Sequence, residues 1–296
     1  MKKRQLGTSN LQISEISLGC MSLPPNPTQA EEVIHAAIDA DINYFDTADL
    51  YNQGENEKVV GAALKQHRHN VFVASKVGNR WEEGKEGWGW DTSADYINKA
   101  VRDSLKRLQT DYLDLYQLHG GTTEDNWEEI TDTFESLKKE GLIREYGISS
   151  IRPNVFMPFL QNSAAVSNMM QFNIFDERAS EFFEPIQQTG ASVVTRGSIA
   201  KGLLTNEWRT RLKSYMSYDE AAAKDVLQKI ELQFGDVHAA ALAFNLQYPT
   251  VASTVIGART VTQLQQNLDA YEKAQSMQNI SEIDSWTKTD RYTEHR

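Results

Sequence analysis

The chain has 296 residues, of which 40% are hydrophobic and 24% charged, so it can bury a sizeable core and is not an intrinsically disordered segment. Its formal net charge is -11, which argues against general binding to nucleic acid or to anionic membranes, because both need basic patches. This length is long for one small domain and normal for one α/β barrel.

The cysteine content and the N-terminal segment bear on the compartment. Cys20 is the one cysteine of the chain, so no intrachain disulfide can form and no CxxC zinc pattern exists. MKKRQLGTSN is basic but leads into no apolar run, and no run is long enough to span a membrane. We expect a cytoplasmic protein, a monomer or weak homo-oligomer, with no nucleic-acid, membrane or metal partner.

Short strand patterns alternate with helical patterns along the chain. Residues 1–14 are expected to form a β-hairpin with its turn at Thr8–Asn10. Eight strand patterns follow, at residues 16–18, 43–45, 71–74, 112–118, 144–148, 166–172, 191–194 and 251–256.

Helical patterns separate these strands. Thr28 is the expected N-cap of the first helix, with Glu31 completing a capping box, and Asp91 or Thr92 is expected to cap the third. Further helices are expected at residues 55–66, 93–108, 127–140, 153–161, 182–189, 218–233, 236–248 and 260–271.

Eight strand-helix units joined by right-handed crossovers can close into a barrel. The fold class expected is therefore α/β, a (β/α)8 TIM barrel with an N-terminal β-hairpin. Residues 1–296 are expected to form a single barrel domain, in which residues 275–296 are a polar C-terminal tail and residues 78–91 and 197–217 are long loops.

Four ionisable residues follow successive apolar strand runs. Asp46 and Tyr51 lie in NYFDTADLYNQGENE, Lys76 in VFVASK and His119 in LDLYQLH. In a barrel these positions share the C-terminal rim, where such folds keep their chemistry. Each residue alone has an ordinary structural explanation, such as an ion pair or a loop aromatic, but four on one rim favour a functional site.

The residue types point to proton transfer to an oxygen. An ammonium lowers the pKa of a neighbouring phenol and stabilises the phenolate left behind. Lys76 could supply that charge to Tyr51, Asp46 could hold Lys76 by an ion pair, and His119 could donate a hydrogen bond to a substrate oxygen. This set suits protonation of a carbonyl oxygen as a hydride reaches its carbon.

These motifs resemble those of a known family. DTADLYNQGENE is similar to the aldo-keto reductase signature D-T-A-x-x-Y-G-x-x-E, and VASK, LYQLH, YGISS, MQFNIFD and AKGLL resemble further blocks in the same order, over roughly residues 5–270. The resemblance implies a bacterial NADPH-dependent enzyme with a (β/α)8 barrel and no Rossmann fold. It implies Tyr51 as general acid, tuned by Lys76 and Asp46, with His119 orienting the carbonyl.

The resemblance also implies cofactor contacts. Ser149, Ser150 and Gln171 match positions that bind the nicotinamide carboxamide, although the family usually has Asn in place of Ser150. Arg196 stands where many members stack a tyrosine on the nicotinamide, and a guanidinium plane can also stack. A nucleophile elbow, G-x-S-x-G, would need a glycine at the fifth position of GISSI, where this chain has Ile151.

The remaining expected cofactor contacts lie in three segments. Arg259, beside a helix N-terminus, can bind a 2′-phosphate, which favours NADPH over NADH. The full set of these contacts is Cys20 and Met21 after the first strand, the loop residues Gly197, Ser198, Lys201 and Gly202, and Gly257, Arg259, Gln263 and Asn267 at the last strand and helix.

The function expected is NADPH-dependent reduction of aldehydes or ketones. The alternative is a nicotinamide-binding regulatory protein with slow turnover, like a potassium-channel β subunit. A barrel isomerase or lyase would not need Tyr51 with Lys76. Trp81, Trp88 and Trp90 could wall a hydrophobic substrate pocket or simply pack their loop onto the barrel.

Overall fold

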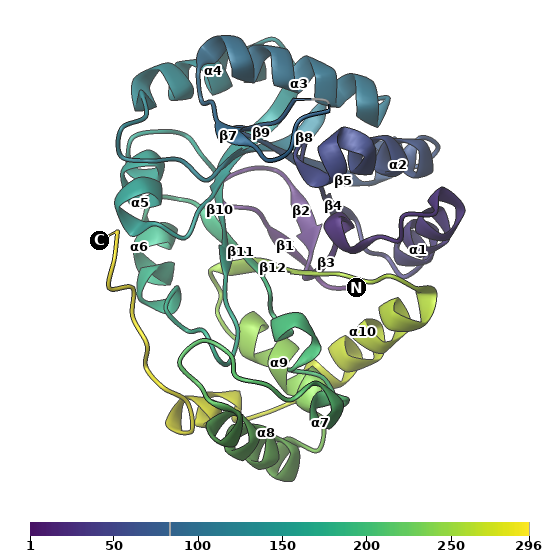
Figure 1. The fold of residues 1–296 in the computed structure, drawn as a ribbon, viewed down its shortest axis with the longest axis vertical. Coiled ribbons are helices and arrows are strands. Elements are labelled where there is room, and N and C mark those ends of the chain that lie inside the picture. Colours follow the sequence, from purple (N-terminus) through teal and green to yellow (C-terminus); the bar gives the residue numbers. More distant parts are fainter. Residues whose placement is uncertain (83, 296) are drawn as a thin grey trace.

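A computed structural model describes residues 1–82 and 84–295. Its centre is a closed barrel of parallel strands surrounded by helices (Figure 1), as the alternating patterns predict. Glu83 of the expected loop and Arg296 of the expected tail lie outside the described residues. The barrel strands are β3 (Ile16–Gly19), β4 (Tyr44–Asp46), β5 (Phe72–Val77), β8 (Leu113–His119), β9 (Ile143–Ser149), β10 (Ser167–Gln171), β11 (Ser192–Arg196) and β12 (Val251–Ile256).

The helices pack their apolar faces against these strands. In α3, buried positions recur at helical spacing, and Lys106 and Arg107 lie in the last turn, where cations favour the helix dipole. The helices are α1 (Pro27–Asp39), α2 (Glu55–Leu64), α3 (Ala94–Leu108), α4 (Trp127–Lys139), α5 (Pro153–Gln161), α6 (Phe183–Gln188), α7 (Trp208–Arg211), α8 (Glu220–Phe234), α9 (Val237–Leu246) and α10 (Val261–Ala274).

Two expected helix caps are wrong. Asn26, not Thr28, caps α1, because its side chain accepts from the Gln29 amide and Pro27 occupies the first helical position without needing a donor. Ser93 caps α3 by accepting from the Tyr96 amide. In both helices the N-cap is a polar residue outside the apolar repeat, so that repeat does not locate the first turn.

The N-terminal hairpin, β1 (Lys3–Gln5) with β2 (Gln12–Ser14), closes one end of the barrel. In Figure 1 it lies at the centre of the helical ring. Its turn glycine, Gly7, has a positive φ of 55° and approaches other backbone so closely that an added Cβ would lie 2.3 Å from the Val166 carbonyl oxygen. The hairpin residues in contact with the inner apolar cluster are Leu6, Leu11 and Ile13.

The inner cluster forms the floor beneath the C-terminal rim. Side chains two residues apart on a strand share a face, so each inward apolar residue is followed by an inward polar one. The pairs are Tyr44 and Asp46 on β4, Ala74 and Lys76 on β5, Leu115 and Gln117 on β8, Met169 and Gln171 on β10, and Val194 and Arg196 on β11.

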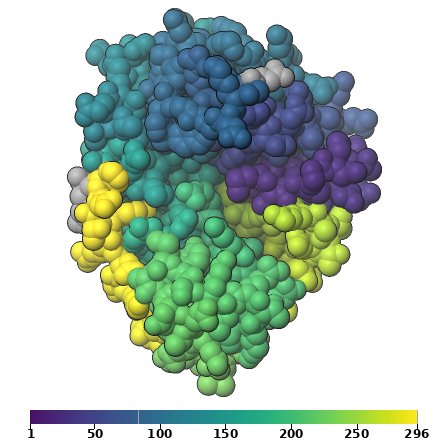
Figure 2. All heavy atoms as spheres, viewed as in Figure 1, coloured from purple at the N-terminus to yellow at the C-terminus, as the bar shows by residue number. Residues whose placement is uncertain are grey.

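Two segments flank the mouth above this floor. Residues 78–91 contain the short antiparallel ribbon β6 (Asn79–Arg80) with β7 (Gly89–Trp90), and the segment after β11 contains α7. Figure 2 shows these blue and green segments on opposite sides of the same face. Both were expected to be loops, and each carries some local structure.

The expected polar tail is more integrated than its composition suggests. A short 3-10 helix at Ile280–Ser285 buries Ile280 and Ile283, and Tyr292 is 6% exposed. Sparse apolar residues in a polar segment give no periodic signal, so sequence patterning missed this packing. Within the described residues, no helix is long and apolar enough to cross a membrane.

We predict that the hairpin is required for stability. Ile13→Ala should lower the free energy of unfolding by about 2–5 kcal/mol, because it opens a cavity in the inner cluster at a fully buried position. Urea denaturation measures this loss. Leu232→Ala is the control: Leu232 is 90% exposed, and its loss should stay within about 0.5 kcal/mol. Equal losses in the two variants would contradict the prediction.

Candidate functional site

The Lys76 ammonium lies at the centre of the candidate site. It donates to Asp46 Oδ2 at 2.7 Å, to the Thr47 carbonyl oxygen at 2.7 Å and to the Tyr51 hydroxyl at 3.4 Å. Lys76 is fully buried and Asp46 is 3% exposed. Each of the three ammonium donors therefore has an oxygen acceptor, which is what a buried cation needs.

Burial and pairing act against each other at this ion pair. Burial disfavours the Lys76 ammonium, but the Asp46 and Tyr51 oxygens outweigh that effect and raise the pKa of Lys76. Burial raises the pKa of Asp46, and Lys76 opposes the rise. The buried Gln117 amide, in register with Lys76, also favours the Asp46 carboxylate, although it does not reach hydrogen-bond geometry.

Tyr51 is presented by an unusual backbone turn. Asn52, Gln53 and Gly54 all have left-handed backbones, with φ of 51°, 51° and 82°. Asn52 stands where the family usually has Gly, and Asn tolerates the left-handed region. Gln53 lies in the same region although its side chain does not favour it. A left-handed non-glycine residue costs about 1–3 kcal/mol, so the surrounding structure must hold this turn in place.

His119 faces Tyr51 across the site. The two rings are 6.2 Å apart and nearly perpendicular, at 87°. Burial, with the charges of Lys76 and Arg196, lowers the pKa of His119 to about 3. Its Nδ1 atom is buried and lacks a hydrogen-bond partner among the described residues. A neutral imidazole with spare bonding capacity is suited to a ligand oxygen.

A second buried network supports the signature loop from outside the barrel. Glu57 accepts from Ser75 Oγ at 2.5 Å and from Arg107 Nε at 2.6 Å. Burial and the Glu57 charge raise the pKa of Asp49 to about 8. This network connects α2, β5 and α3, so it anchors the segment that carries Tyr51.

Gln171 and Arg196 contact each other at the rim. Arg196 donates to Gln171 Oε1 at 3.3 Å, and Gln171 Nε2 donates to Asp176 at 2.7 Å. Ser149, at the end of β9, is buried. Ser150 is tied to its own turn, since its hydroxyl accepts from the Arg152 amide.

The loop after β11 is compact. Gly197 has a φ of 71°, and Ala200, Lys201 and Gly202 continue with positive φ values of 45°, 57° and 91°. A Cβ at Gly202 would lie 2.6 Å from an Arg211 guanidinium nitrogen, so the arginine side chain would have to move. Lys201 is exposed, whereas Ser198 is buried beside Thr195.

The segment after β12 presents Arg259 at the N-terminus of α10. Arg259 is exposed, and its backbone amide donates to Gln263 Oε1 at 2.8 Å. Asn267 is buried and donates to the Gly257 carbonyl oxygen at 3.3 Å. Gly257 packs so tightly on Ser22 that a Cβ would lie 2.2 Å from its hydroxyl. Gln263 and Asn267 therefore hold this turn together.

The expected cofactor residues thus differ in accessibility. Cys20 is fully buried, burial raises the pKa of its thiol, and its backbone oxygen accepts from Asn56 at 2.8 Å. Met21 is 66% exposed. Hydrogen bonds and a ring contact join the four expected catalytic residues to one another. Arg259 instead follows β12, which β3 separates from β4 in the barrel.

The aromatic loop reaches the rim. Trp90 lies against Gly120, and the Arg152 guanidinium is 6.0 Å from its ring. Trp88 packs edge-on against Trp90 at 4.9 Å, and both remain about half exposed. Exposed indoles beside His119 leave an apolar surface available near the expected chemistry.

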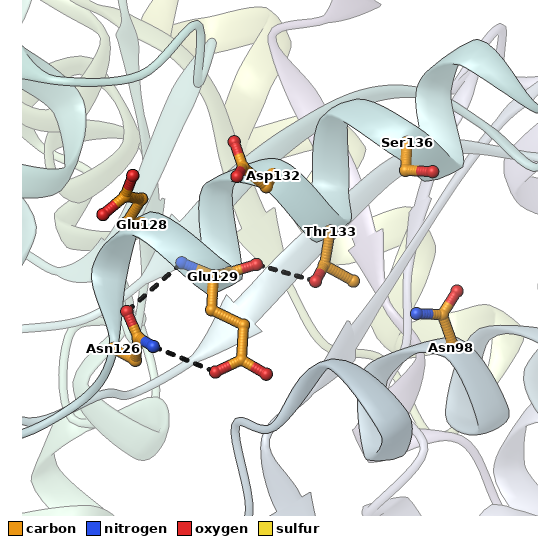
Figure 3. Close-up of a pocket in the computed structure, with 7 residues that line it drawn as sticks. All are labelled: Asn98, Asn126, Glu128, Glu129, Asp132, Thr133 and Ser136. Atoms are coloured by element: carbon orange, nitrogen blue, oxygen red, sulfur yellow. Dashed lines mark hydrogen bonds between the residues drawn. The ribbon is translucent and has the colours of Figure 1, made fainter.

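A hollow on the outer surface, between α3 and α4, is a different kind of feature (Figure 3). Its lining is acidic and amide-rich, and none of the four rim residues contributes to it. In the close-up, Asn126 and Glu129 hydrogen-bond each other as part of the N-terminal cap of α4. These side chains serve the helix, and we place the candidate site at the barrel mouth.

Sequence reasoning missed several residues around the site. Gln117 is an amide inside an apolar strand, and strand alternation could have placed it inward beside Lys76. Asp176 ends the MQFNIFD block and Arg178 follows it, but only the tertiary fold brings Asp176 onto Gln171 and Arg178 onto Asp176. Thr47 contributes a backbone oxygen, which no side-chain pattern reveals.

The barrel agrees with a family match. The aldo/keto reductase family model matches residues 6–288, so the chain belongs to the aldo/keto reductase family of oxidoreductases. It is 46% identical, over the full length of both chains, to the oxidoreductase YqkF of Bacillus subtilis.

Solved structures extend the match. The holo form of aldo-keto reductase AKR11C1 from Bacillus halodurans superposes with a TM-score of 0.94 at 46% identity, covering 100% of this chain and 99% of that one. Its apo form gives 0.85 at 42% identity with the same coverage. The backbone described here is thus more similar to the holo form.

Aldo-keto reductases use nicotinamide cofactors, and the residues present fit such a group. The Ser149 hydroxyl, the Gln171 amide oxygen and the exposed Arg196 plane offer polar and stacking contacts beside His119. The exposed Arg259 guanidinium at a helix N-terminus suits a phosphate.

We predict a pH dependence of stability that originates at His119. Its pKa is about 3 in the folded protein and 6.5 in a free chain. Below pH 6.5 the unfolded chain binds a proton that the folded chain does not, so stability falls as the pH drops toward 3. Between pH 7.5 and pH 5 the wild type should lose about 2 kcal/mol more than His119→Asn.

Urea unfolding of both proteins at the two pH values measures this difference. His238, whose pKa burial lowers to about 4, is present in both proteins, and its contribution cancels. Identical pH dependence in wild type and variant would mean that His119 is freely protonated in the folded state.

Proposed function

We propose that this protein reduces aldehydes or ketones to alcohols with NADPH, and that Tyr51 donates the proton. The observation that carries the proposal is the buried Lys76 ammonium, which contacts the Asp46 carboxylate and the Tyr51 hydroxyl beside a neutral His119. Such a cluster offers an acid, a charge that stabilises its conjugate base, and a donor for the substrate oxygen.

The protein residues have separate tasks in this reaction. A bound reduced nicotinamide would supply the hydride that adds to the carbonyl carbon. Tyr51 transfers its hydroxyl proton to the carbonyl oxygen, and the resulting phenolate is stabilised by Lys76 and reprotonated from solvent. Neutral His119 donates to the same oxygen and orients it. Alcohol oxidation uses these groups in reverse.

The long 3.4 Å contact between Lys76 and Tyr51 is compatible with this role. Hydrogen bonds at catalytic groups are often long without ligands and shorten in the reacting complex. Asp46 keeps the ammonium in place, because its carboxylate and the Thr47 carbonyl each hold Lys76 at 2.7 Å. The remaining donor is left for Tyr51.

The exposed indoles support an apolar or aromatic carbonyl substrate. Trp88 and Trp90 border the rim beside Gly120, next to His119 along the chain. Burying an aromatic surface against them would add to binding without touching the reacting oxygen. Arg259 supports NADPH over NADH, because a guanidinium can bind a 2′-phosphate through two hydrogen bonds.

We predict that Tyr51→Phe lowers kcat/KM for an activated aromatic aldehyde by about 100-fold or more, since the general acid is removed. The dissociation constant for NADPH should stay within about threefold, because the ring remains. Stopped-flow absorbance of NADPH and fluorescence titration measure the two quantities. Tyr112→Phe, at a partly exposed tyrosine that stacks on Arg68 and Arg144, is the matched control. Full activity of Tyr51→Phe would overturn the mechanism.

We predict that Arg259→Gln weakens NADPH binding roughly 10- to 100-fold, the range expected for losing a charge-assisted hydrogen bond. NADH lacks the 2′-phosphate, so its dissociation constant should not change and serves as an internal control. Isothermal titration of the wild type and the variant with both cofactors gives the four values. A parallel loss for both cofactors would place Arg259 elsewhere on the cofactor.

A further inference from the structure

The amide of Gln171 has one fixed orientation. Its Nε2 donates to Asp176 Oδ2 at 2.7 Å, while its Oε1 accepts from Arg196 at 3.3 Å. A carboxylate can only accept, so a flipped amide would place two acceptors against each other. Gln171 therefore presents its oxygen to the rim and accepts an N–H there.

Asp176 is itself held by a guanidinium. Arg178 Nε donates to Asp176 Oδ1 at 2.7 Å, and Arg178 Nη2 donates to Oδ2 at 3.0 Å. Asp176 is 1% exposed. A bidentate pair fixes both the position and the plane of the carboxylate, which a lysine in place of Arg178 could not do.

The C-terminal tail contacts this pair through Tyr292. The Arg178 guanidinium lies 4.8 Å from the centre of the Tyr292 ring, and Tyr292 is also 6.1 Å from the Phe182 ring. At 6% exposure, Tyr292 is the most deeply inserted aromatic residue of the tail's last ten described residues. Its ring therefore packs against the Arg178 guanidinium, which in turn holds Asp176.

Tail contacts on both sides of Tyr292 keep it in place. The Asn154 amide donates to the His295 carbonyl oxygen at 2.8 Å, and the Lys288 amide donates to the Tyr218 hydroxyl at 2.5 Å. Ser217 also donates to Asp290. Figure 1 shows the tail running from the region of α8 past α6 and α5. The tail is thus attached where the loop after β11 ends and at the start of α5.

We propose that Asp176, Arg178 and Tyr292 are positioning residues that fix Gln171 for the carboxamide N–H of the nicotinamide, so that tail docking and cofactor binding favour each other. The inference rests on the proposed function, because it assigns a partner to Gln171. The coupling is reciprocal: whatever the docked tail adds to cofactor affinity, the cofactor adds to tail docking.

The experiment compares two ligands on the full-length protein freed of cofactor. NADPH carries the carboxamide, and adenosine 2′,5′-bisphosphate carries only the adenosine half. Isothermal titration measures both dissociation constants for wild type, Asp176→Asn, Tyr292→Ala and Tyr292→Phe. Asp176→Asn and Tyr292→Ala should each weaken NADPH binding roughly three- to tenfold, as for one lost hydrogen bond, with adenosine 2′,5′-bisphosphate unchanged. Tyr292→Phe keeps the ring and should therefore bind NADPH with wild-type affinity.

Three other outcomes would overturn the inference. Unchanged NADPH affinity in both Asp176→Asn and Tyr292→Ala would show that Gln171 needs no positioning. Equal weakening of both ligands would show a general structural role for the tail. If the wild type binds neither ligand, the proposed function and this inference both fail. That outcome is seen in the wild type alone, whereas failure of the inference by itself is seen only in the variants.

Discussion

The buried pair of Lys76 and Asp46 is the constraint around which the barrel mouth is organised. A charge in the protein interior is tolerated only when it is paired and its hydrogen-bonding capacity is used. The ammonium has three acceptors, each from the β4 end or the segment after it. Removing one partner would leave the other charge buried and unpaired, at a cost of about 3–5 kcal/mol.

That pair determines the state of its neighbours. Burial lowers the pKa of His119 most, and the positive charge of Lys76 adds to that effect, so the ring is neutral. Lys76 also contacts the Tyr51 hydroxyl at the end of a left-handed turn. The same charge therefore acts on two neighbours: it disfavours an imidazolium at His119 and holds the Tyr51 hydroxyl at 3.4 Å.

The apolar floor below the rim makes this arrangement possible. The inner cluster, closed by the N-terminal hairpin, excludes water from beneath Asp46 and Lys76. Low polarity strengthens the contacts above it, and it is also what raises the pKa of the Asp46 carboxyl. A second set of contacts, from Asp176 to Tyr292, links the opposite side of the rim to the C-terminal tail.

The sequence by itself determined the barrel and the identity of its polar rim. Strand and helix periodicities are local, so eight units could be counted, and their order puts Asp46, Tyr51, Lys76 and His119 at one end. The cap at Asn26 and the left-handed Gln53 were missed, since neither follows from an apolar pattern.

Only the tertiary structure decided which of those residues meet, and in what protonation state. A pKa depends on burial and on charges from distant strands, so His119 could not be recognised as neutral from LDLYQLH alone. Likewise, the tail has no pattern that predicts docking, yet Tyr292 stacks on Arg178, more than a hundred residues earlier in the chain. Such contacts join residues that are far apart in the chain, so local sequence patterns do not predict them.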